Sequence, residues 1–434
     1  MLFQIVLAVV AAAVLFSGKA LYTSGRLPFS IHRRRASELN NAASDPISSS
    51  VPDVDTLPVD ESAVPDSTIT TIWAIGDLHG DAMCARYWLN RTGLIDSETD
   101  AWKGSTSKLV FVGDYVDKGP TSLETVQLVK SLEERYSNVV ALMGNHELEV
   151  LNDRLPPEQR RRYWYQLPYS TVHPDDMLSY APENEVTADT HRALDILYDL
   201  ALDEIYGKNQ FRSVDFSPYG EKSICNLIED EAESKMVREE LDKLQNYYIN
   251  SYSSDTELGQ WVEKRPITHI HEDLIFLHGG INPQIMDIDG GVPSASDLSD
   301  LNSAFASSSS TSHLSPFMKS LHGQIVYDLV TYRGNHKSCR EVEFVAERLN
   351  VSKVIVGHTP DDNVRVMCDE SFLAIDSALG RWIRVNGNQY CRGDVTRNSK
   401  NGRYTCDKIA GFCEGGIVRL DRKEEGGWDV NVIT

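Results

Sequence analysis

Residues 69–81, ITTIWAIGDLHGD, decide the fold of this chain. A run of β-branched and apolar residues ends there in the glycine-flanked turn Gly76-Asp77-Leu78-His79-Gly80. The run predicts a buried strand, and the turn would bring Asp77 and His79 to the carboxyl end of a sheet. A carboxylate and an imidazole are good ligands for divalent first-row metals. Because the same residues also occur in ordinary loops, the rest of the chain has to decide between a metal site and a plain turn.

Four further predicted strands end in a similar polar turn that contains glycine. They are residues 107–112 before GDYVDKGP (113–120), 138–143 before GNHE (144–147), 274–277 before HGG (278–280) and 353–356 before GHTP (357–360). A helical pattern at 122–136 separates the second strand from the third, and such alternation predicts an α/β layered domain. Ligands of open α/β sheets bind beyond the carboxyl ends of the strands. We therefore expect the five turns to converge at the same edge of one sheet.

The remaining parts of the domain predict a second sheet and a helical insertion. Strand patterns at 372–375, 416–420 and 428–433 predict a second sheet, packed behind the first. Residues 154–265 are rich in aromatic and charged side chains and show helical patterns at 193–206 and 227–248. This segment predicts a mostly helical insertion, and its sequence does not indicate a function.

Composition restricts the class of ligand. With 41% hydrophobic residues, the 434-residue chain can bury a sizeable core. Its formal net charge of -22 makes the surface repel polyanions. A nucleic-acid partner is therefore not expected, because non-specific nucleic-acid binding depends on basic residues.

The N-terminus predicts a targeting or anchoring segment. Residues 2–16 are uncharged and mostly apolar, but shorter than the roughly 20 residues that cross a bilayer unaided. Gly18-Lys19-Ala20 offers a small-x-small cleavage site, which favours a signal peptide over residues 1–22, although no Lys or Arg precedes the run. The basic residues follow the run, and in an uncleaved anchor they would hold the rest of the chain in the cytosol. We expect the membrane or the secretory pathway, with cleavage against anchoring left open.

A linker separates this segment from the folded domain. Residues 36–66 contain four prolines, many Ser and Asp, and no Lys or Arg. Such a composition buries too little apolar surface to offset the entropy of ordering. We expect a disordered acidic linker over residues 23–67 and the catalytic domain over 68–434.

Sequons and cysteines favour a lumenal location. Asn90-Arg91-Thr92 and Asn350-Val351-Ser352 match the N-glycosylation pattern. Five of the seven cysteines lie in the last quarter of the chain, which suits one or two disulfides in an oxidising compartment. These signals oppose the charge distribution around an uncleaved anchor, and the sequence leaves the conflict open.

Taken together, the five turns resemble a known family. GDLHGD, GDYVDKG, GNHE, HGG and GHT, which span residues 76–359, are similar to the motifs of the calcineurin-like metallophosphoesterases. Within them the chain resembles the phosphoprotein phosphatases, and most of all the Shewanella-like protein phosphatases. The resemblance implies a metallophosphoesterase fold of class α/β, with two packed mixed β-sheets flanked by helices in an α/β/β/α arrangement.

The resemblance also implies two divalent metal ions. Asp77 and His79 would hold one, Asp114 would bridge both, and the second would be completed by three residues, Asn145, His278 and His358. A bridging carboxylate suits two cations about 3.5–4 Å apart, which activate a hydroxide and neutralise phosphoryl oxygens. Nitrogen and oxygen ligands without thiolate fit manganese, which we expect, and also iron or zinc.

Four further residues receive roles from the same resemblance. His146 would protonate the leaving oxygen as general acid, and Asp117 would orient its imidazole. Lys118 replaces the Arg of the eukaryotic enzymes, so it can neutralise a phosphate without gripping it bidentately. Arg333, in Tyr-Arg-Gly, is the candidate for a second phosphate contact. Glu147 is expected to be structural.

Three functions follow from this pattern. The first is a phosphatase that hydrolyses phosphoserine, phosphothreonine or phosphotyrosine in proteins. The second is a metallophosphoesterase for a dinucleotide polyphosphate or another small phosphate ester; GNHE argues against it, because the dinucleotide branch usually has Asp after the His. The third is an inactive phosphate-binding scaffold on a membrane, which the intact ligand set disfavours.

Overall fold

The computed structural model describes residues 68–96, 101–156, 159, 174–204, 214–284, 294–310, 312–381, 395–397, 399, 404–406 and 411–434. The predicted signal peptide or anchor (1–22) and the acidic linker (23–67) lie outside these residues. Within the described part of the chain, no helix has both the length and the apolar character needed to cross a membrane.

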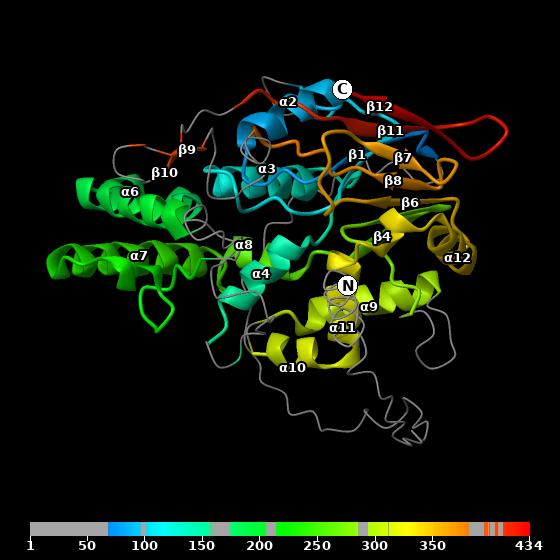
Figure 1. The fold of residues 1–434 in the computed structure, drawn as a ribbon. Coiled ribbons are helices and arrows are strands. Elements are labelled where there is room, and N and C mark those ends of the chain that lie inside the picture. Colours follow the sequence, from blue (N-terminus) through cyan, green and yellow to red (C-terminus); the bar gives the residue numbers. More distant parts are fainter. Residues whose placement is uncertain are drawn as a thin grey trace, which may run out of the picture. The chain divides into compact units, whose positions relative to one another are not determined.

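Two five-stranded mixed sheets form the centre of the domain, as predicted. The first has the order β12-β11-β1-β2-β3 and the second the order β4-β5-β6-β8-β7. Figure 1 labels β12, β11 and β1 of the first sheet and β4, β6, β8 and β7 of the second. The strands of the first sheet are β1 (Thr71–Ile75), β2 (Ser107–Phe111), β3 (Val139–Ala141), β11 (Ile417–Arg422) and β12 (Trp428–Ile433). Those of the second are β4 (Thr268–His271), β5 (Leu274–Leu277), β6 (Lys353–Val356), β7 (Arg365–Met367) and β8 (Phe372–Ala374). A separate two-stranded ribbon pairs β9 (Val395–Arg397) with β10 (Tyr404–Cys406).

The division of the strands between the sheets differs from the prediction. We expected the five motif strands in one sheet and the three late strands in the other. Instead β1, β2 and β3 run parallel in the first sheet, while β5, β6 and β8 run parallel in the second. The late strands β11 and β12 return to the first sheet, where β11 pairs antiparallel with β1. The expectation that all five turns lie at the edge of one sheet was wrong. The site lies where the carboxyl ends of the parallel strands of both sheets meet.

Helices surround the sheets. They are α2 (Ala82–Thr92), α3 (Ser122–Arg135), α4 (Asn145–Asp153), α5 (Pro174–Met177), α6 (Ala188–Leu202), α7 (Glu231–Ser251), α8 (Glu257–Glu263), α9 (Ala295–Ser308), α10 (Leu314–Lys319), α11 (Leu321–Thr331) and α12 (Cys339–Leu349). Short 3₁₀ turns occur at η2 (Leu178–Tyr180), η3 (Glu183–Glu185), η5 (Ile224–Leu227) and η7 (Gly334–Lys337). Helix α2 begins at the cap residue Asp81, whose side chain accepts from the Cys84 N–H, and ends at Gly93 in the left-handed conformation.

Strand periodicity explains the layers. In β1, Ile72 and Ala74 belong to a buried cluster that joins both sheets, and β5 contributes Phe276 to it. The alternate residues Trp73 and Ile75 belong to a cluster that includes the buried faces of the surrounding helices. Because successive strand side chains point to opposite faces, one set fills the space between the sheets and the other packs under helices.

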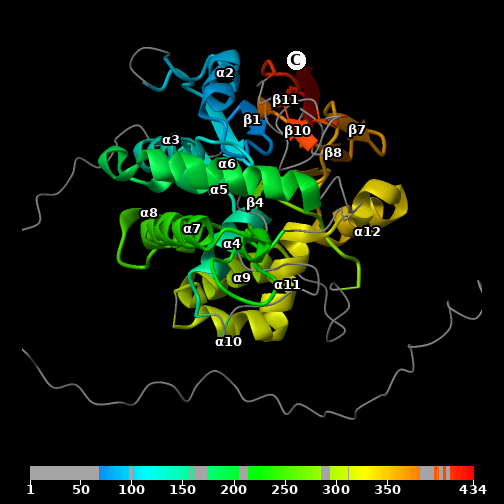
Figure 2. The same cartoon turned by 60° about the vertical axis from the view of Figure 1, so that its left-hand side comes forward.

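The segment 154–265 contains α5 to α8 in its described part. Helices α6 and α7 lie side by side in both views (Figure 1 and Figure 2). Ala193, Leu197 and Ala201 of α6 share a small core with Val237 and Leu241 of α7, at the i, i+4 spacing of one helix face. This core is separate from that of the sheets, so the helix pair has its own hydrophobic support.

Two disulfides link distant parts of the domain. Cys84 of α2 bonds to Cys413 near the C-terminus, and Cys339 of α12 bonds to Cys368 after β7. The cysteine pattern predicts one or two such bridges. Cys225 is a buried free thiol, and Cys391 lies outside the described residues.

Candidate active site

The turn after β1 holds two of the predicted ligands. Asp77 and His79 are both buried, and His79 adopts a left-handed backbone with φ of 45°. One Asp77 oxygen lies 3.7 Å from His79 Nε2, and both its oxygens accept from the backbone N–H of His358, at 3.2 and 3.1 Å. The backbone N–H groups of Leu78 and His79 each donate to the Asp114 carbonyl at 3.0 Å. The turn is therefore tied to both sheets.

Asp114, after β2, lies at the centre of the site. Its Oδ2 is 3.2 Å from His278 Nε2 and 3.7 Å from both His79 Nε2 and His146 Nε2. Its Oδ1 accepts from the His146 N–H at 2.9 Å. A side chain on Gly144 would come 2.2 Å from that oxygen, so only glycine fits at this close approach. One carboxylate thus faces ligands from both sheets.

The second sheet supplies the remaining histidines. His278 follows β5, and its Nδ1 is 2.9 Å from the Val112 carbonyl at the end of β2. That contact directs Nε2 toward Asn145 Oδ1, 3.0 Å away at the start of α4. His358 follows β6 with φ of 66° and stacks edge-on against His278. All six predicted ligands therefore meet in one buried region.

The donor set suits divalent cations. The ligand atoms of His79, Asp114 and His146 lie within 4.8 Å of one another, and so do those of Asp114, His278 and His358. Both groups could hold a metal ion, and they share Asp114. The Lys118 ammonium reaches 2.7 Å from His79 Nε2, so a positive charge already sits where these atoms converge. The residues present therefore fit two cations linked by one carboxylate.

Burial keeps most of the imidazoles neutral, the form that binds metals. Burial and the Lys118 ammonium lower the pKa of His79 to about 3. The pKa of His358 is lowered by burial, and then by His278 and Arg333. Burial opposes the charged forms of Asp114 and His278 too, but their mutual attraction holds the Asp114 pKa low and the His278 pKa high. Burial, followed by repulsion from Asp376, raises the pKa of Asp77.

His146 and Asp117 form a dyad beside the ligands. His146 Nδ1 lies 2.6 Å from Asp117 Oδ2, and both side chains are buried. The Asp117 N–H donates to Ser122 Oγ at 3.0 Å, which fixes its turn. Burial, then the Asp176 and Asp153 carboxylates, raises the pKa of Asp117, while burial and Lys118 lower that of His146. With Nδ1 bound to Asp117, the His146 Nε2 faces Asp114 and the ligand cluster.

The two predicted phosphate contacts differ in position. Lys118 Nζ lies inside the site, 3.3 Å from His146 Nε2 as well as next to His79. Arg333, just before η7, has an exposed side chain, but its charge contributes to the lowered pKa of His358. Lys118 is therefore in the centre of the site and Arg333 at its margin.

Glu147 links the turn after β2 to the turn after β3 by hydrogen bonds. Its Oε2 accepts from the N–H groups of Asp114 (2.8 Å) and Gly144 (2.9 Å). Its Oε1 accepts from those of Tyr115 (2.8 Å) and Val116 (3.3 Å). The side chain is fully buried, so this one carboxylate satisfies four backbone donors that no water reaches. Burial and the Asp114 charge raise its pKa to about 7.

We expect Glu147→Gln to destabilise the protein. The amide turns one acceptor into a donor and leaves two buried N–H groups unsatisfied, at about 1–3 kcal/mol each, or about 2–6 kcal/mol in all. Urea unfolding followed by circular dichroism measures the loss. Glu124→Gln on α3, 57% exposed, is the matched control and should change the free energy of unfolding by less than about 0.5 kcal/mol. A Glu147→Gln protein as stable as that control would show that the four contacts do not brace the turns.

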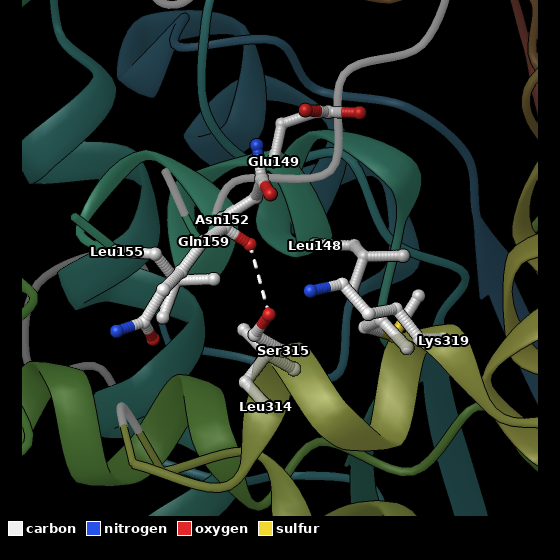
Figure 3. A pocket seen from close by; sticks show the side chains of 9 residues that line it. Leu148, Glu149, Asn152, Leu155, Gln159, Leu314, Ser315 and Lys319 are labelled. Atoms are coloured by element: carbon white, nitrogen blue, oxygen red, sulfur yellow. Dashed lines mark hydrogen bonds between the residues drawn. The ribbon is translucent and has the colours of Figure 1, made fainter. Parts of the chain in front are cut away.

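A cavity between α4 and α10 is lined by residues that follow the predicted ligand Asn145 along the chain, and by residues of α10 (Figure 3). Its volume is about 20 Å³, and Leu148, Leu155 and Leu314 contribute to an apolar lining. Ser315 closes one side by donating to the Gln159 carbonyl at 2.9 Å. A space of this size holds about one water molecule, so it is not a substrate site.

Comparison with known proteins agrees with this geometry. The family model described as calcineurin-like phosphoesterase matches residues 70–362, more than half of the chain. The chain belongs to the calcineurin-like phosphoesterases. The match includes all five motif turns and the predicted ligands. It also includes the parallel strands β1, β2 and β3 of the first sheet and β5 and β6 of the second. The predicted enzyme class, a metal-dependent phosphatase, is confirmed by this membership, and the family implies divalent metal ions.

Individual relatives of this calcineurin-like phosphoesterase have different names. An uncharacterized protein of Schizosaccharomyces pombe is 24% identical over 71% of the chain and 73% of its own length. A Shewanella-like protein phosphatase 2 of Arabidopsis thaliana is 38% identical over 17% of the chain and 20% of its own length. A symmetrical bis(5'-nucleosyl)-tetraphosphatase of Xylella fastidiosa is 36% identical over 21% of the chain and 28% of its own length. The chain thus spans less than a third of the two relatives whose names state an activity.

Solved structures are more distant in sequence. A cold-active protein-tyrosine phosphatase of a psychrophilic Shewanella species has a TM-score of 0.47 at 18% identity, over 83% of this chain and 80% of its own. A protein serine/threonine phosphatase of Saccharomyces cerevisiae has a TM-score of 0.40 at 13% identity, over 85% and 80%. Identities this low carry no information about the substrate.

Proposed function

We propose that this calcineurin-like phosphoesterase hydrolyses phosphomonoesters in proteins, on phosphoserine, phosphothreonine or phosphotyrosine. The observation that carries the proposal is the His146–Asp117 dyad beside the shared ligand Asp114. A serine alkoxide is a poor leaving group and needs a proton. An imidazole oriented by a carboxylate, with its free nitrogen facing the ligand cluster, is the group that such a substrate requires.

The clustered ligands would hold the cofactor. Asp77, His79 and Asp114 would hold one divalent cation, and Asp114, Asn145, His278 and His358 would hold the other. Manganese suits these nitrogen and oxygen donors, and iron and zinc are the competitors. When bound, two such cations supply an activated hydroxide and neutralise the phosphoryl oxygens.

The other residues handle the proton and the phosphate. His146 holds a proton at Nε2 when a phosphate dianion lies next to it, because the added negative charge favours the imidazolium. Asp117 keeps the ring oriented through Nδ1 and stabilises the charged form. Lys118 neutralises one phosphate oxygen, and Arg333 at the margin contacts the phosphate or the substrate chain around it.

A second candidate substrate is a dinucleotide polyphosphate. It is favoured by the likeness to the Xylella fastidiosa tetraphosphatase, which aligns at an identity similar to that of the Arabidopsis thaliana phosphatase. The same ligands, Lys118 and His146 would serve a phosphoanhydride. That substrate needs the acid less, because its phosphate leaving group is a weaker base than an alkoxide.

A substrate panel tests the proposal. The purified protein, loaded with manganese, is given phosphoserine, phosphothreonine and phosphotyrosine peptides, diadenosine tetraphosphate and p-nitrophenyl phosphate. We expect kcat/KM on at least one phosphopeptide to exceed that on diadenosine tetraphosphate by about tenfold, a difference of about 1.4 kcal/mol. The reverse order would favour the second candidate. No turnover of any substrate would favour the inactive scaffold.

We also infer that the domain works in the secretory pathway, attached to a membrane through its N-terminal segment or released from it by cleavage. The two disulfides support an oxidising compartment. Asn90 and Asn350, the acceptors of the two sequons, both have exposed side chains, as a glycosylated residue must.

Glycosylation tests this location. The protein expressed in its own cells should shift to a lower mass after treatment with an N-glycosidase, which removes N-linked glycans. Asn90→Gln and Asn350→Gln should each remove part of that shift, and the double variant all of it. A protein whose mass does not respond to the glycosidase would place the domain on the cytosolic side.

A further inference from the structure

A sixth strand also ends at the candidate site. Strand β8 runs parallel to β6 in the second sheet, and the Ile375 N–H extends this pairing by donating to the Val356 carbonyl at 2.7 Å. Asp376 follows directly. Because parallel strands end at the same edge, Asp376 comes to the edge where His278 and His358 follow their strands.

The turn that carries Asp376 lies against the turn of the first motif. A side chain on Gly76 would come 2.3 Å from the Ile375 carbonyl and 3.3 Å from Asp376 Cα. After burial, repulsion from the Asp376 charge is the largest cause of the raised pKa of Asp77. The contact therefore brings an acidic residue of the second sheet next to the first predicted ligand of the first sheet.

The Asp376 side chain is buried and incompletely satisfied. It is 1% exposed, and its Oδ1 accepts from the Ala378 N–H at 3.2 Å. Its Oδ2 has no hydrogen-bond partner among the described residues. Of the charged groups that act on it, Lys118 attracts it and Asp114 repels it. A buried carboxylate with a free oxygen beside two other carboxylates is unfavourable unless it is protonated or its charge is balanced by a cation.

We propose that Asp376 is a further acidic residue of the metal centre, which together with Asp77 and His79 binds the first divalent cation. This inference rests on the two-metal centre of the proposed function. A divalent cation turns the repulsion among the carboxylates into attraction, so a third carboxylate strengthens its binding. Asp376 contributes to metal affinity in this way, while the substrate contacts belong to His146, Lys118 and Arg333.

The chain offers a variant that removes the charge alone. Asp376→Asn keeps a carbonyl oxygen that can accept from the Ala378 N–H, so the loop contact survives. Asp300→Asn, an exposed position on α9, changes the net charge by the same amount and serves as the control. Each protein is stripped with a chelator and then titrated with manganese by isothermal titration calorimetry. Its melting temperature is recorded with and without the metal.

We expect Asp376→Asn to weaken manganese binding at one of the two sites by about 10- to 100-fold, the range for residues that support metal ligands. The melting temperature without metal should stay the same or rise, because a like charge is removed next to Asp77. The increase in melting temperature that manganese causes should be smaller than in the wild type. Asp300→Asn should match the wild type in all three measurements.

Two results would overturn the inference. Manganese affinities in Asp376→Asn within about twofold of the wild type would show that the charge does not serve the metal. A lower melting temperature without metal, at unchanged affinity, would make Asp376 a purely structural residue. Both outcomes leave the proposed function intact if the wild type binds two manganese ions and hydrolyses a phosphopeptide. A wild-type protein that binds no manganese would contradict the metal centre itself.

Discussion

Asp114→Asn is expected to abolish metal retention and hydrolysis together. One carboxylate faces His79 from the first sheet and His278 from the second, so its charge serves both predicted cations. The amide keeps the shape of the side chain but loses the charge and one of the two acceptor oxygens. Lewis-acid stabilisation is worth several kcal/mol, so we expect kcat on p-nitrophenyl phosphate to fall by about 1,000-fold or more. Calorimetric titration with manganese should show neither site at full affinity.

Asp117→Asn is the matched control for this prediction. Asp117 is a buried aspartate of the same turn, but it contacts His146 Nδ1 and Ser122 rather than the predicted ligands. Its substitution should leave both manganese sites in place. If Asp114→Asn bound two manganese ions as tightly as the wild type, Asp114 would not be the shared ligand.

His146→Ala should separate catalysis from metal binding. Its Nε2 lies 3.7 Å from Asp114 Oδ2, so distance alone would also allow it to bind a metal. If His146 is the general acid, the loss of kcat caused by its removal should increase with the basicity of the leaving group. We expect a loss of about 100-fold or more in kcat on a phosphoserine peptide and a smaller loss on p-nitrophenyl phosphate. Manganese stoichiometry should not change.

The pattern across substrates and variants decides the role of His146. Asp117→Asn should reproduce the same substrate dependence more weakly, because it orients the ring and does not donate the proton. Equal losses on both substrates with metals retained would point to phosphate binding. Loss of one manganese ion in His146→Ala would make His146 a ligand, and the assignment of the acid would be wrong.

The sequence allowed the fold class and the bounds of the strands that lead to the site turns to be predicted, because periodicity marks strands locally. It did not allow the neighbours of each strand to be predicted. Strand β11 pairs with β1 across more than 300 residues, as in the register Ile72 with Leu420. The strands β1 and β5 are both apolar on their two faces, so nothing in their patterns assigns them to different sheets.

The candidate site was predictable for a related reason. Each expected ligand follows a strand with a glycine in the turn, and this pattern can be read without knowing the sheet. Asp376 follows the pattern in AIDSALG, but β8 was expected in a sheet behind the site, so its carboxylate was overlooked. The bracing contacts of Glu147 could not be predicted, because they join backbone groups about 30 residues away.

Anomalous diffraction from manganese-soaked crystals tests the two-metal centre most directly. A two-metal centre predicts two manganese peaks per chain. The Asp114 carboxylate should contact both, with Asp77 and His79 on one and Asn145, His278 and His358 on the other. A single peak, or two peaks of which Asp114 contacts only one, would contradict it.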